Sequence, residues 1–318
     1  KSANIVGATM RLSPHGDMAI YGTMVRLTEG NESLLVPYID SKGNFGKVYS
    51  RDMAFAAPRY TEAKLSKVSQ EFFKDINKNV VDFVPNYDNT TEEPTLLPVT
   101  FPNILVNPNT GIAVGMASNI CSFNLGEICN ATIKRIRGDK DYLKEIKAPD
   151  FPTGGEIIYN KELFQKIYET GKGTFYIRGK YKYDKKNNRV EIYEIPYTTT
   201  VEAIIDSIID LVKKGDVKEL TDIRDGTDKD GLKIILDLKR NTDVEQLMLK
   251  LFKLTPLESN FSCNFNILIE GTPKVMGIGE ILDEWIKFRV ECIERQLRYD
   301  IDKEEHKKYN RYIANHYT

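Results

Sequence analysis

The sequence has few of the residues that build metal sites or disulfides. Its 318 residues include three histidines and four cysteines, and no two cysteines are spaced as C-x-x-C. A structural zinc site is therefore not expected, and a reduced, cytoplasmic setting fits best. No apolar run approaches the roughly 18 to 20 residues of a membrane span, and no signal-peptide pattern opens the sequence, so we expect no membrane partner. The cysteines are Cys121, Cys129, Cys263 and Cys292.

The sequence also lacks an excess of charge of one sign. Its 45 Lys and Arg residues nearly balance its 46 Asp and Glu residues. Residues 1–70 hold nine basic and six acidic residues, a surplus more typical of a solvated face than of a DNA footprint. Because 41% of the residues are hydrophobic, the chain can bury real cores, and its length favours about two domains.

One Arg-Tyr pair stands out among the seventeen tyrosines of the chain, most of which must pack or lie on the surface. Pro58 directly precedes Arg59 and Tyr60, and apolar residues then recur at helical spacing, so the sequence predicts a helix over 61–78. Free N–H groups at a helix start favour a phosphate. A phenol is ionised to roughly one part in a thousand at pH 7, and the adjacent guanidinium would help to ionise it. Tyr60 is thus a candidate nucleophile.

A second helix is predicted to begin at Ser13, with Ser13 as its N-cap and Pro14 in its first turn. His15, Asp17 and Arg26 then lie on or near this helix. These residues are candidates for a functional cluster. The alternative is an ordinary capped helix in which the Asp17 carboxylate only interacts with the positive end of the helix dipole.

A glycine loop and a proline-rich stretch follow. The loop 42–47 contains two glycines, which permit backbone conformations closed to other residues, between two lysines. The stretch 94–102 contains three prolines and breaks regular structure, which predicts a domain boundary near residue 98. Short helices and glycine loops before this break indicate a winged-helix or helix-turn-helix module.

The chain from 99 to 270 changes character and predicts an α+β domain. Apolar residues alternate over 175–181 and 190–195, on either side of a Lys-Lys-Asn-Asn turn, which predicts an antiparallel hairpin. Further strands near 233–238 and 264–269 are expected to complete a mixed layer.

Two helices are predicted around these strands. Thr199 and Glu202 form a capping box for a helix that ends at Gly215. Residues 271–318 predict one long amphipathic helix that leaves the body as a truncated coiled-coil arm. Its apolar stripe consists of Ile281, Trp285, Phe288, Cys292 and Leu297.

An acidic loop resembles part of a calcium site. Asp225, Asp228, Asp230 and Gly231 carry the right residue types, but aligning Gly231 with the invariant glycine of such a loop puts Gly226 at the first ligand position. The better interpretation is a polar turn before a strand.

Four short motifs follow one another along the chain: Ser-Pro-His-Gly-Asp at 13–17, Gly-Asn-Phe-Gly at 43–46, Arg-Tyr-Thr-Glu at 59–62, and Gly-Ile-Ala-Val-Gly-Met-Ala at 111–117. Together they closely resemble the A subunits of bacterial type II topoisomerases, which are DNA gyrase and topoisomerase IV. The likeness covers nearly the whole chain, since it continues through Asp-Phe-Pro-Thr at 150–153, Glu-Ile-Pro-Tyr at 194–197 and Asp-Lys-Asp-Gly at 228–231.

This resemblance implies an α+β multidomain fold with three parts. A winged-helix (CAP-like) DNA-cleavage domain that carries the catalytic tyrosine would span 1–98, and an α/β tower domain would span 99–270. Residues 271–318 would begin a long coiled-coil arm, which agrees with the three segments that the residues alone predict.

The resemblance also implies a reaction. Tyr60 would attack a DNA backbone phosphorus, form a 5′-phosphotyrosyl link and release a 3′-hydroxyl, so that religation needs no ATP. Arg59 would stabilise the charge that develops on the phosphate. His15 matches the family histidine near the cleavage site and is assigned to phosphate binding or support of the transition state.

Three further residues are implied to bind DNA. Arg26 and Lys42 would hold backbone phosphates. Ile112 matches the family isoleucine that wedges between base pairs and bends the duplex, although simple packing is the usual role of an apolar residue near glycines.

The resemblance places the cofactors in a partner. The sequence has no G-x-x-x-x-G-K-[ST] phosphate loop and no residues that would supply a magnesium site, so Mg²⁺ and ATP are both assigned to the topoisomerase B subunit. Two copies of each subunit would form an A2B2 enzyme that acts on double-stranded DNA for supercoiling or decatenation. A second family arginine is expected before Lys1.

The sequence departs from the family pattern in places. The segment between Gly46 and Tyr60 is about two residues longer than in the common gyrase pattern, and Ser13 replaces a histidine. Met18 and Gly22 stand where a serine and an acidic residue commonly anchor quinolone drugs through a water-bridged magnesium ion. We therefore expect poor intrinsic quinolone sensitivity.

Two other protein classes compete with this interpretation. Tyrosine recombinases need a His-x-x-Arg pair that the sequence lacks. A non-catalytic, winged-helix architectural DNA-binding protein with a coiled-coil dimeriser stays open, and in it Tyr60 would only pack. The choice between gyrase and topoisomerase IV also stays open, because the DNA-wrapping domain that decides it lies outside this sequence.

Overall fold

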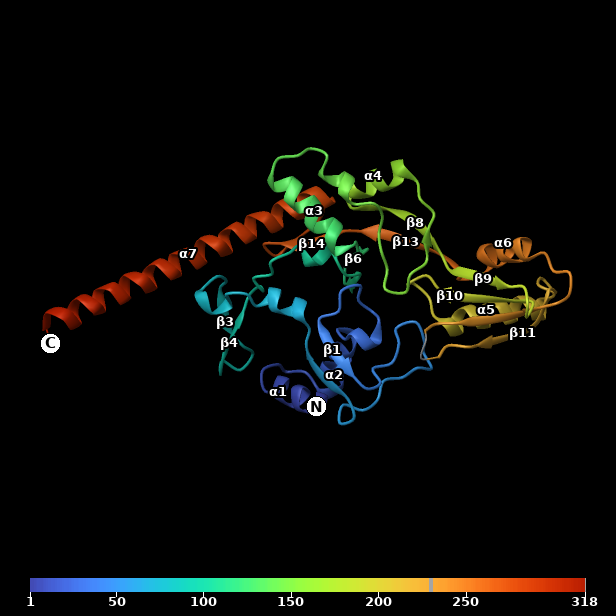
Figure 1. Ribbon diagram of the computed structural model, residues 1–318, viewed down its shortest axis with the longest axis horizontal. Coiled ribbons are helices and arrows are strands. Elements are labelled where there is room, and N and C mark those ends of the chain that lie inside the picture. The colour runs from blue at the N-terminus through green and yellow to red at the C-terminus, as the bar shows by residue number, and fades with distance from the viewer. Residues whose placement is uncertain (229–230, 318) are drawn as a thin grey trace.

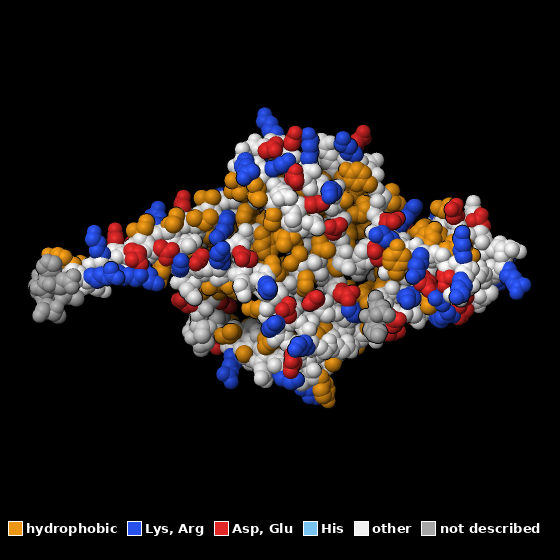
Figure 2. All heavy atoms as spheres, viewed as in Figure 1, with side chains coloured by type: hydrophobic (Ala, Val, Ile, Leu, Met, Phe, Trp, Pro, Cys, Tyr) orange, Lys and Arg blue, Asp and Glu red, His pale blue; other side chains and the backbone are white. Residues whose placement is uncertain are grey.

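A computed structural model describes residues 1–228 and 231–317, with the side chains of the last helix described up to residue 312. In this mixed α/β structure, a central body lies between a long C-terminal helix on one side and a smaller sheet on the other (Figure 1). Acidic and basic side chains are interspersed over the visible face (Figure 2). The mixed character agrees with the α+β class that the sequence predicts.

The N-terminal part consists of two short helices packed against a two-stranded antiparallel sheet. The elements are α1 (Ser2–Thr9), α2 (Asp17–Arg26), a 3-10 helix at Glu29–Asn31, β1 (Ile39–Lys42) and β2 (Glu62–Leu65). Apolar side chains from the helices and the connecting loop meet in a small core of Val6, Tyr21, Met24, Val25 and Phe45.

The predicted start of the second helix is wrong by three residues, since its N-cap was expected at Ser13. The helix α2 begins at Asp17, and its N-cap is Gly16, which has an extended backbone. Ser13 does not cap this helix, because its N–H donates to the Thr9 carbonyl at 3.0 Å and so closes the end of α1. Ser13 and Pro14 therefore belong to the turn between the two helices.

The helix predicted over 61–78 is also wrong. The strand β2 and two 3-10 helices, Lys67–Phe72 and Ile76–Lys78, take its place. Leu65 pairs with Ile39 across the small sheet, and Thr61 is buried. Pairing with a strand more than twenty residues earlier overrides the helical spacing, because tertiary contacts outweigh local propensity.

The segment after these 3-10 helices packs along the C-terminal helix α7 (Ile278–Tyr317). Val80 and Val81 are buried against Cys292 of this helix. Arg295 of α7 donates to the Asn79 carbonyl at 2.6 Å and pairs with Asp82 at 2.9 Å. A small hairpin of β3 (Phe83–Pro85) and β4 (Glu92–Pro94) follows, and then a 3-10 helix at Asn103–Leu105.

The central body contains a five-stranded antiparallel sheet in the order β5-β6-β13-β8-β7. Phe175 lies at the middle of its core, with ring centres 5.2 to 6.3 Å from those of Phe151, Phe164 and Phe261. Phe72, from the N-terminal part, packs into the same core. The elements are β5 (Asn109–Ala113), β6 (Met116–Ile120), α3 (Leu125–Ile136), a 3-10 helix at Tyr142–Glu145, β7 (Glu156–Ile157), α4 (Lys161–Thr170), β8 (Lys172–Arg178) and β13 (Glu258–Asn264).

A second antiparallel sheet, in the order β11-β12-β10-β9, packs with two helices around its own core. Buried residues of both helices and of three strands build this core, and the edge strand β9 contributes the partly buried Tyr181. The elements are β9 (Lys180–Asp184), β10 (Arg189–Glu194), α5 (Val201–Lys214), β11 (Leu220–Asp225), β12 (Ile234–Leu238) and α6 (Val244–Leu254).

The predicted hairpin exists, but its first strand is shorter than expected. β9 and β10 form it, whereas Phe175 and Ile177 belong to β8 in the other sheet. The chain changes sheet at Gly179, where a Cβ atom would lie 2.6 Å from a Leu257 methyl carbon and 2.8 Å from the Glu194 carbonyl oxygen. The expected strand near 264–269 does not join this layer.

Two predicted boundaries are corrected in detail. The cap of α5 is Thr200, whose hydroxyl accepts the Ala203 N–H at 3.3 Å, and not Thr199. The helix ends at Gly215 as predicted, with a left-handed backbone at φ +81°. The late strand is β14 (Asn266–Ile269), which pairs only with β15 (Thr272–Val275) among the described strands.

The acidic loop forms a turn at its described residues. Asp228 and Gly231 pair across it through two backbone hydrogen bonds of 3.2 Å. Asp230 and Lys229 lie outside the described residues. Within the described chain, no group of three or more His, Cys, Asp or Glu side chains is placed to hold a metal ion.

The long helix α7 confirms that a long helix ends the chain, but it begins at Ile278 and not at residue 271, because Thr272–Val275 form the strand β15. Ile281 and Cys292 are buried, Trp285 and Phe288 are partly buried, and Leu297 is exposed where the helix leaves the body. Figure 1 shows its last turns extending away from every other element. None of the helices in residues 1–228 and 231–317 combines the length and apolar character needed to cross a membrane.

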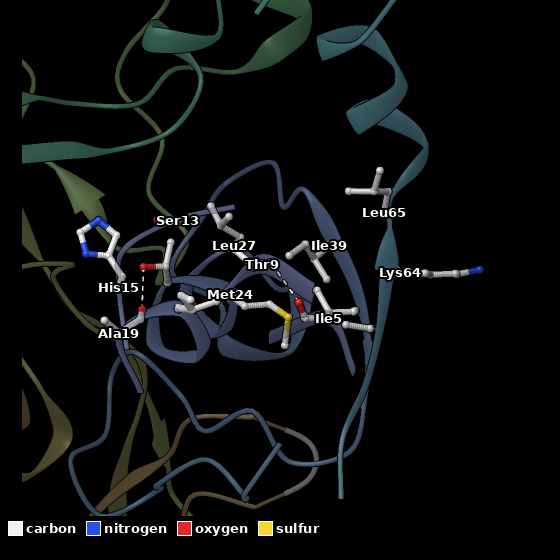
Figure 3. Close-up of a pocket in the computed structure, with 13 residues that line it drawn as sticks. Ile5, Thr9, Ser13, His15, Ala19, Met24, Leu27, Ile39, Lys64 and Leu65 are labelled. Atoms are coloured by element: carbon white, nitrogen blue, oxygen red, sulfur yellow. Dashed lines mark hydrogen bonds between the residues drawn. The ribbon is translucent and has the colours of Figure 1, made fainter. Parts of the chain in front are cut away.

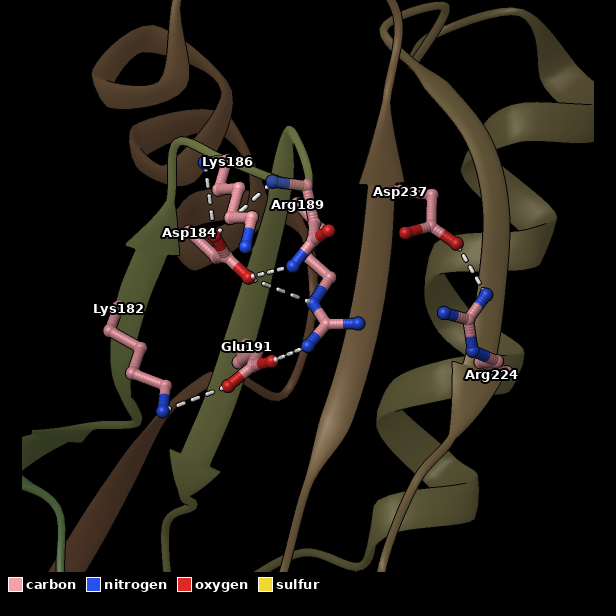
Figure 4. A network of polar contacts seen from close by, with 8 residues as sticks. Lys182, Asp184, Lys186, Arg189, Glu191, Arg224 and Asp237 are labelled. Carbon is pink, nitrogen blue, oxygen red and sulfur yellow. Dashed lines mark hydrogen bonds and ion pairs between the residues drawn. The ribbon is translucent and has the colours of Figure 1, made fainter.

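A buried carboxylate lies within the four-stranded sheet (Figure 4). Glu191 on β10 is 4% exposed, and its two carboxylate oxygens pair with Lys182 at 2.9 Å and Arg189 at 2.6 Å. The hydrogen bond from Lys182, helped by the charge of Arg189, holds the pKa of Glu191 below its ordinary value. The sheet is thus tied across β9 and β10 by one charged group.

We expect Glu191→Gln to lower the free energy of unfolding by about 1 to 2 kcal/mol at pH 7, because two charge-assisted hydrogen bonds weaken. A carboxyl with a lowered folded pKa stabilises above its unfolded pKa and loses that contribution as pH falls through the folded pKa. The gap between wild type and variant should therefore shrink between pH 7 and about pH 3. Urea unfolding at several pH values measures this gap.

Asp222→Asn, on the exposed edge of the same sheet, is the control, and its free energy of unfolding should change little. A gap that does not vary with pH would contradict the prediction.

Candidate functional site

The Arg59–Tyr60 pair lies on a turn at the surface. The Tyr60 side chain is 65% exposed, and the guanidinium carbon of Arg59 lies 4.6 Å from the centre of its ring. This cation–π contact keeps a positive charge beside the ring. The Tyr60 N–H donates to the Ala57 carbonyl at 3.0 Å and closes the turn. The phenol is free to meet a ligand, with a cation next to it.

The turn is held from beneath by Thr61, whose side chain is fully buried. The Thr61 hydroxyl lies 2.8 Å from the Ser2 hydroxyl oxygen and 2.9 Å from the Tyr21 hydroxyl oxygen. The first N–H groups of α1 donate to the same turn, from Ser2 to the Thr61 carbonyl at 3.0 Å and from Ala3 to the Pro58 carbonyl at 3.1 Å. Tyr60 is therefore fixed on a turn between α1 and α2, and not at a helix start.

Basic side chains surround this turn. Lys42, at the end of β1, lies opposite Glu62 in the register of the small sheet. The Lys1 ammonium group forms an ion pair with the Glu62 carboxylate at 2.8 Å. The Lys1 hydrogen bond, with a smaller effect of the Lys42 charge, lowers the pKa of Glu62. Gly43 follows Lys42, and a Cβ atom on it would lie 3.5 Å from the Tyr60 carbonyl oxygen. The glycine loop and the Tyr60 turn thus touch.

The other predicted residues lie on α2 or just before it. His15 is exposed at one end of a cavity of about 740 Å³ between α1, α2, β1 and β2 (Figure 3). Met18, Gly22 and Arg26 line a second cavity, of about 800 Å³, on another side of α2. Within the described chain, no hydrogen bond or ion pair joins His15 or Arg26 to Tyr60. The structure thus brings Arg59 and Lys42 to the tyrosine turn and leaves the others along the neighbouring helix.

Ile112 lies near the tip of the β5–β6 hairpin. Its side chain is 89% exposed, and it pairs in register with Ala117. Gly115 makes the tight turn with φ +78°, and a Cβ atom placed on Gly111 or Gly115 would have no neighbouring atom within 4 Å. The hairpin tip thus presents apolar side chains to solvent, a feature that is common at interaction sites.

Sequence reasoning missed Val114, which is 102% exposed beside Ile112 on the same tip. Its signal was an apolar residue between glycines in a hairpin turn, a place where turn residues are usually polar. Sequence reasoning also missed the anchoring role of Thr61. That role depends on contacts with Ser2 and Tyr21, and no local sequence pattern predicts these contacts.

A family model that describes the A subunit of DNA gyrase and topoisomerase IV matches residues 1–315. This chain belongs to that family. The DNA gyrase A subunits of several bacteria are similar to this chain over almost all of its residues. The DNA gyrase A subunit of Borreliella burgdorferi is 40% identical over 315 residues, that of Ureaplasma parvum 42% over 311 residues, and that of Neisseria gonorrhoeae 38% over 316 residues.

The chain spans only part of these gyrase relatives. The three alignments cover 95 to 96% of this chain and 34 to 38% of the relatives. Family membership therefore applies to the chain itself, whereas the activity and assembly of the longer relatives require a separate argument.

Proposed function

We propose that this chain carries the DNA-cleaving tyrosine of a type II topoisomerase A subunit. The observation that supports it most is the exposed Tyr60 phenol, held on a buried hydrogen-bonded turn with Arg59 against its ring, in a chain of this family. A non-catalytic architectural protein, in which Tyr60 only packs, fits the 65% exposure of this side chain poorly.

The reaction follows from one nucleophile and the charges around it. The Tyr60 hydroxyl loses its proton, and its oxygen forms a bond to a backbone phosphorus of double-stranded DNA. The bond from that phosphorus to the 3′ oxygen breaks, and the released 3′-hydroxyl takes up a proton. Because one ester replaces another, the reverse attack rejoins the strand without ATP. Arg59 stabilises the negative charge on the phosphate in the transition state.

The remaining site residues position the DNA. Arg26 and Lys42 hold backbone phosphates, and His15 binds a phosphate or supports the transition state. Ile112 inserts between base pairs and bends the duplex, as exposed apolar wedges do in other DNA-bending proteins. The apolar hairpin tip supports this role, because no part of the described chain covers it.

The fold, partners and setting are part of the same proposal. Residues 1–98 form a winged-helix cleavage domain, 99–270 a tower domain, and 271–318 the start of a coiled-coil arm. A homodimer of A subunits joins two B subunits, and the B subunits supply Mg²⁺ and ATP. The assembly works in the cytoplasm and passes one duplex through another.

The test is chemical mapping of the covalent bond. The full-length A subunit, together with the B subunit, is incubated with duplex DNA labelled at its 3′ ends, denatured to trap cleaved complexes, and digested with a protease. We expect the label on a peptide that contains Tyr60. A label on any other residue rejects the proposal.

Drug sensitivity gives a separate prediction. Met18 is exposed on α2, and a Cβ atom on Gly22 would meet no atom within 4 Å, so Met18→Ser with Gly22→Asp should fit without repacking. We expect wild type to form few cleavage complexes with ciprofloxacin and the double variant to form at least about tenfold more, because a hydroxyl and a carboxylate add polar anchors. Drug titration of DNA cleavage measures this. Gly7→Asp, on α1 with equally open space, is the control. An unchanged response would contradict the prediction.

A further inference from the structure

The loop that leads to Tyr60 is anchored in the core of the four-stranded sheet. Tyr49 is 3% exposed and belongs to the buried core that β10, β11, β12, α5 and α6 build. The Val201 N–H, at the start of α5, donates to the Tyr49 carbonyl at 2.9 Å. Val48 and Met53 pack against the same core. A loop of the N-terminal part therefore contributes to a core that is otherwise built from residues 181–257.

Glu202 of α5 binds the tip of this loop at residues 50–52, a set of contacts that we call the clamp. Its carboxylate accepts hydrogen bonds from the Ser50 hydroxyl and, at 3.1 Å, from the Asp52 N–H. Arg51 lies 4.0 Å from its second oxygen and 3.4 Å from Asp206. Burial by itself would raise the pKa of Glu202, but these hydrogen bonds outweigh burial and hold the pKa at about 2. The clamp therefore stays charged at neutral pH.

The other end of the loop is fastened to α2. The Ala56 N–H donates to the Asn44 carbonyl at 2.9 Å, and the Asn44 amide donates to the Ala54 carbonyl at 3.0 Å. The Tyr21 hydroxyl of α2 donates to the Ala56 carbonyl at 2.8 Å. At Gly46, with φ +66°, a Cβ atom would lie 2.6 Å from the Met53 carbonyl oxygen, so the loop closes tightly at its base.

Only a few residues lie between these contacts and Tyr60. Two residues separate the anchored Met53 from Ala56, and the turn that carries Tyr60 begins with Ala57, directly after Ala56. A shift of the loop tip is thus transmitted to Tyr60 through a short, hydrogen-bonded segment.

We propose that Glu202 and Tyr49 are positioning residues, which fix Tyr60 by holding its loop between α5 and α2. The inference rests on the proposed function of Tyr60. A nucleophile must lie within a few tenths of an ångström of its working position, and a misplacement of about 1 Å costs on the order of a hundredfold in rate. Glu202 acts through the loop and touches no DNA in this role.

The test separates positioning from binding. The full-length A subunit with its B subunit cleaves duplex DNA in a single turnover at saturating DNA, and the rate of Tyr60-linked DNA formation is measured beside the Kd for DNA. For Glu202→Ala we expect this rate to fall at least about tenfold while the Kd changes less than about threefold. Glu202→Gln, which keeps an oxygen acceptor, should recover most of the rate. Asp206→Asn, which removes only an exposed contact of Arg51, is the matched control and should cleave like wild type.

The outcomes are distinct. If Glu202→Ala does not fold, Ser50→Ala removes a single hydroxyl donor of the same clamp and should also slow cleavage. Normal wild-type cleavage with unchanged rates in the Glu202 and Ser50 variants overturns the positioning role alone. A fall in thermal stability without a change in the cleavage rate also overturns it. Absence of Tyr60-linked DNA in wild type overturns the proposed function itself.

Discussion

Tyr60→Phe is expected to abolish covalent DNA attachment while DNA binding persists. The change removes one oxygen atom, and the ring remains for Arg59 to contact. Within the described chain no hydrogen bond involves the Tyr60 hydroxyl, so the fold loses no partner. Because this hydroxyl is the proposed nucleophile, we expect covalent product to fall by more than about four orders of magnitude, to the limit of detection.

The measurement combines three readings on the A subunit with its B subunit. Denaturing gels report covalent DNA, a titration reports the Kd for DNA, and thermal unfolding reports folding. The Kd should stay within about twofold and the unfolding temperature within about a degree, since a surface hydroxyl contributes little to either. Tyr87→Phe is the matched control, because Tyr87 is also an exposed tyrosine. Covalent attachment that survives Tyr60→Phe would show that another residue attacks the DNA.

Local signals in the sequence were enough for elements whose contacts are local. The helix α5 ends at Gly215 as predicted, because a left-handed C-cap is chemistry of one residue and its neighbours. The long helix α7 was predicted from apolar residues that recur at helical spacing, and the β9–β10 hairpin follows from alternation around a polar turn. Each of these depends on residues close together along the chain.

The predictions failed where distant contacts decide the structure. After Tyr60 the chain forms the strand β2 because β1 offers it a partner, although apolar residues recur at helical spacing. The sheet change at Gly179 depends on how closely Leu257 and the Glu194 carbonyl approach. Neither neighbour is visible in a local pattern, so the sequence alone could not locate these boundaries.

The candidate site divides in the same way. Arg59 and Tyr60 are adjacent in sequence, and the structure adds only that the guanidinium contacts the ring. The support of the pair comes from Ser2 and Tyr21, which lie 59 and 40 residues from Thr61. The clamp by Glu202 acts across 152 residues from Ser50. Motifs identify the residues that we propose to react, whereas the residues that hold them in place are found only in the folded chain.

The second large effect is expected at Gly171, where α4 ends against the start of α7. Gly171 has φ +69°, and a Cβ atom on it would lie 2.2 Å from the Met276 carbonyl oxygen and 2.9 Å from the Phe265 Cβ atom. The Gly171 carbonyl also accepts the Phe265 N–H at 2.9 Å, so the backbones cannot separate without losing that bond. An alanine here adds left-handed strain of about 1 kcal/mol and overpacking of about 1 to 3 kcal/mol.

Gly171→Ala should therefore lower the free energy of unfolding by roughly 2 to 4 kcal/mol, which denaturant titration of the purified chain can measure. Gly215→Ala is the matched control. Gly215 also ends a helix with a left-handed backbone, at φ +81°, but the nearest atom to its Cβ position is a flexible Lys218 carbon at 3.9 Å. It should lose only the strain of about 1 kcal/mol. Equal losses in the two variants would mean that the contact between α4 and the start of α7 yields freely. A larger loss at Gly171 would show that the close contacts with Met276 and Phe265 cannot relax to admit a methyl group.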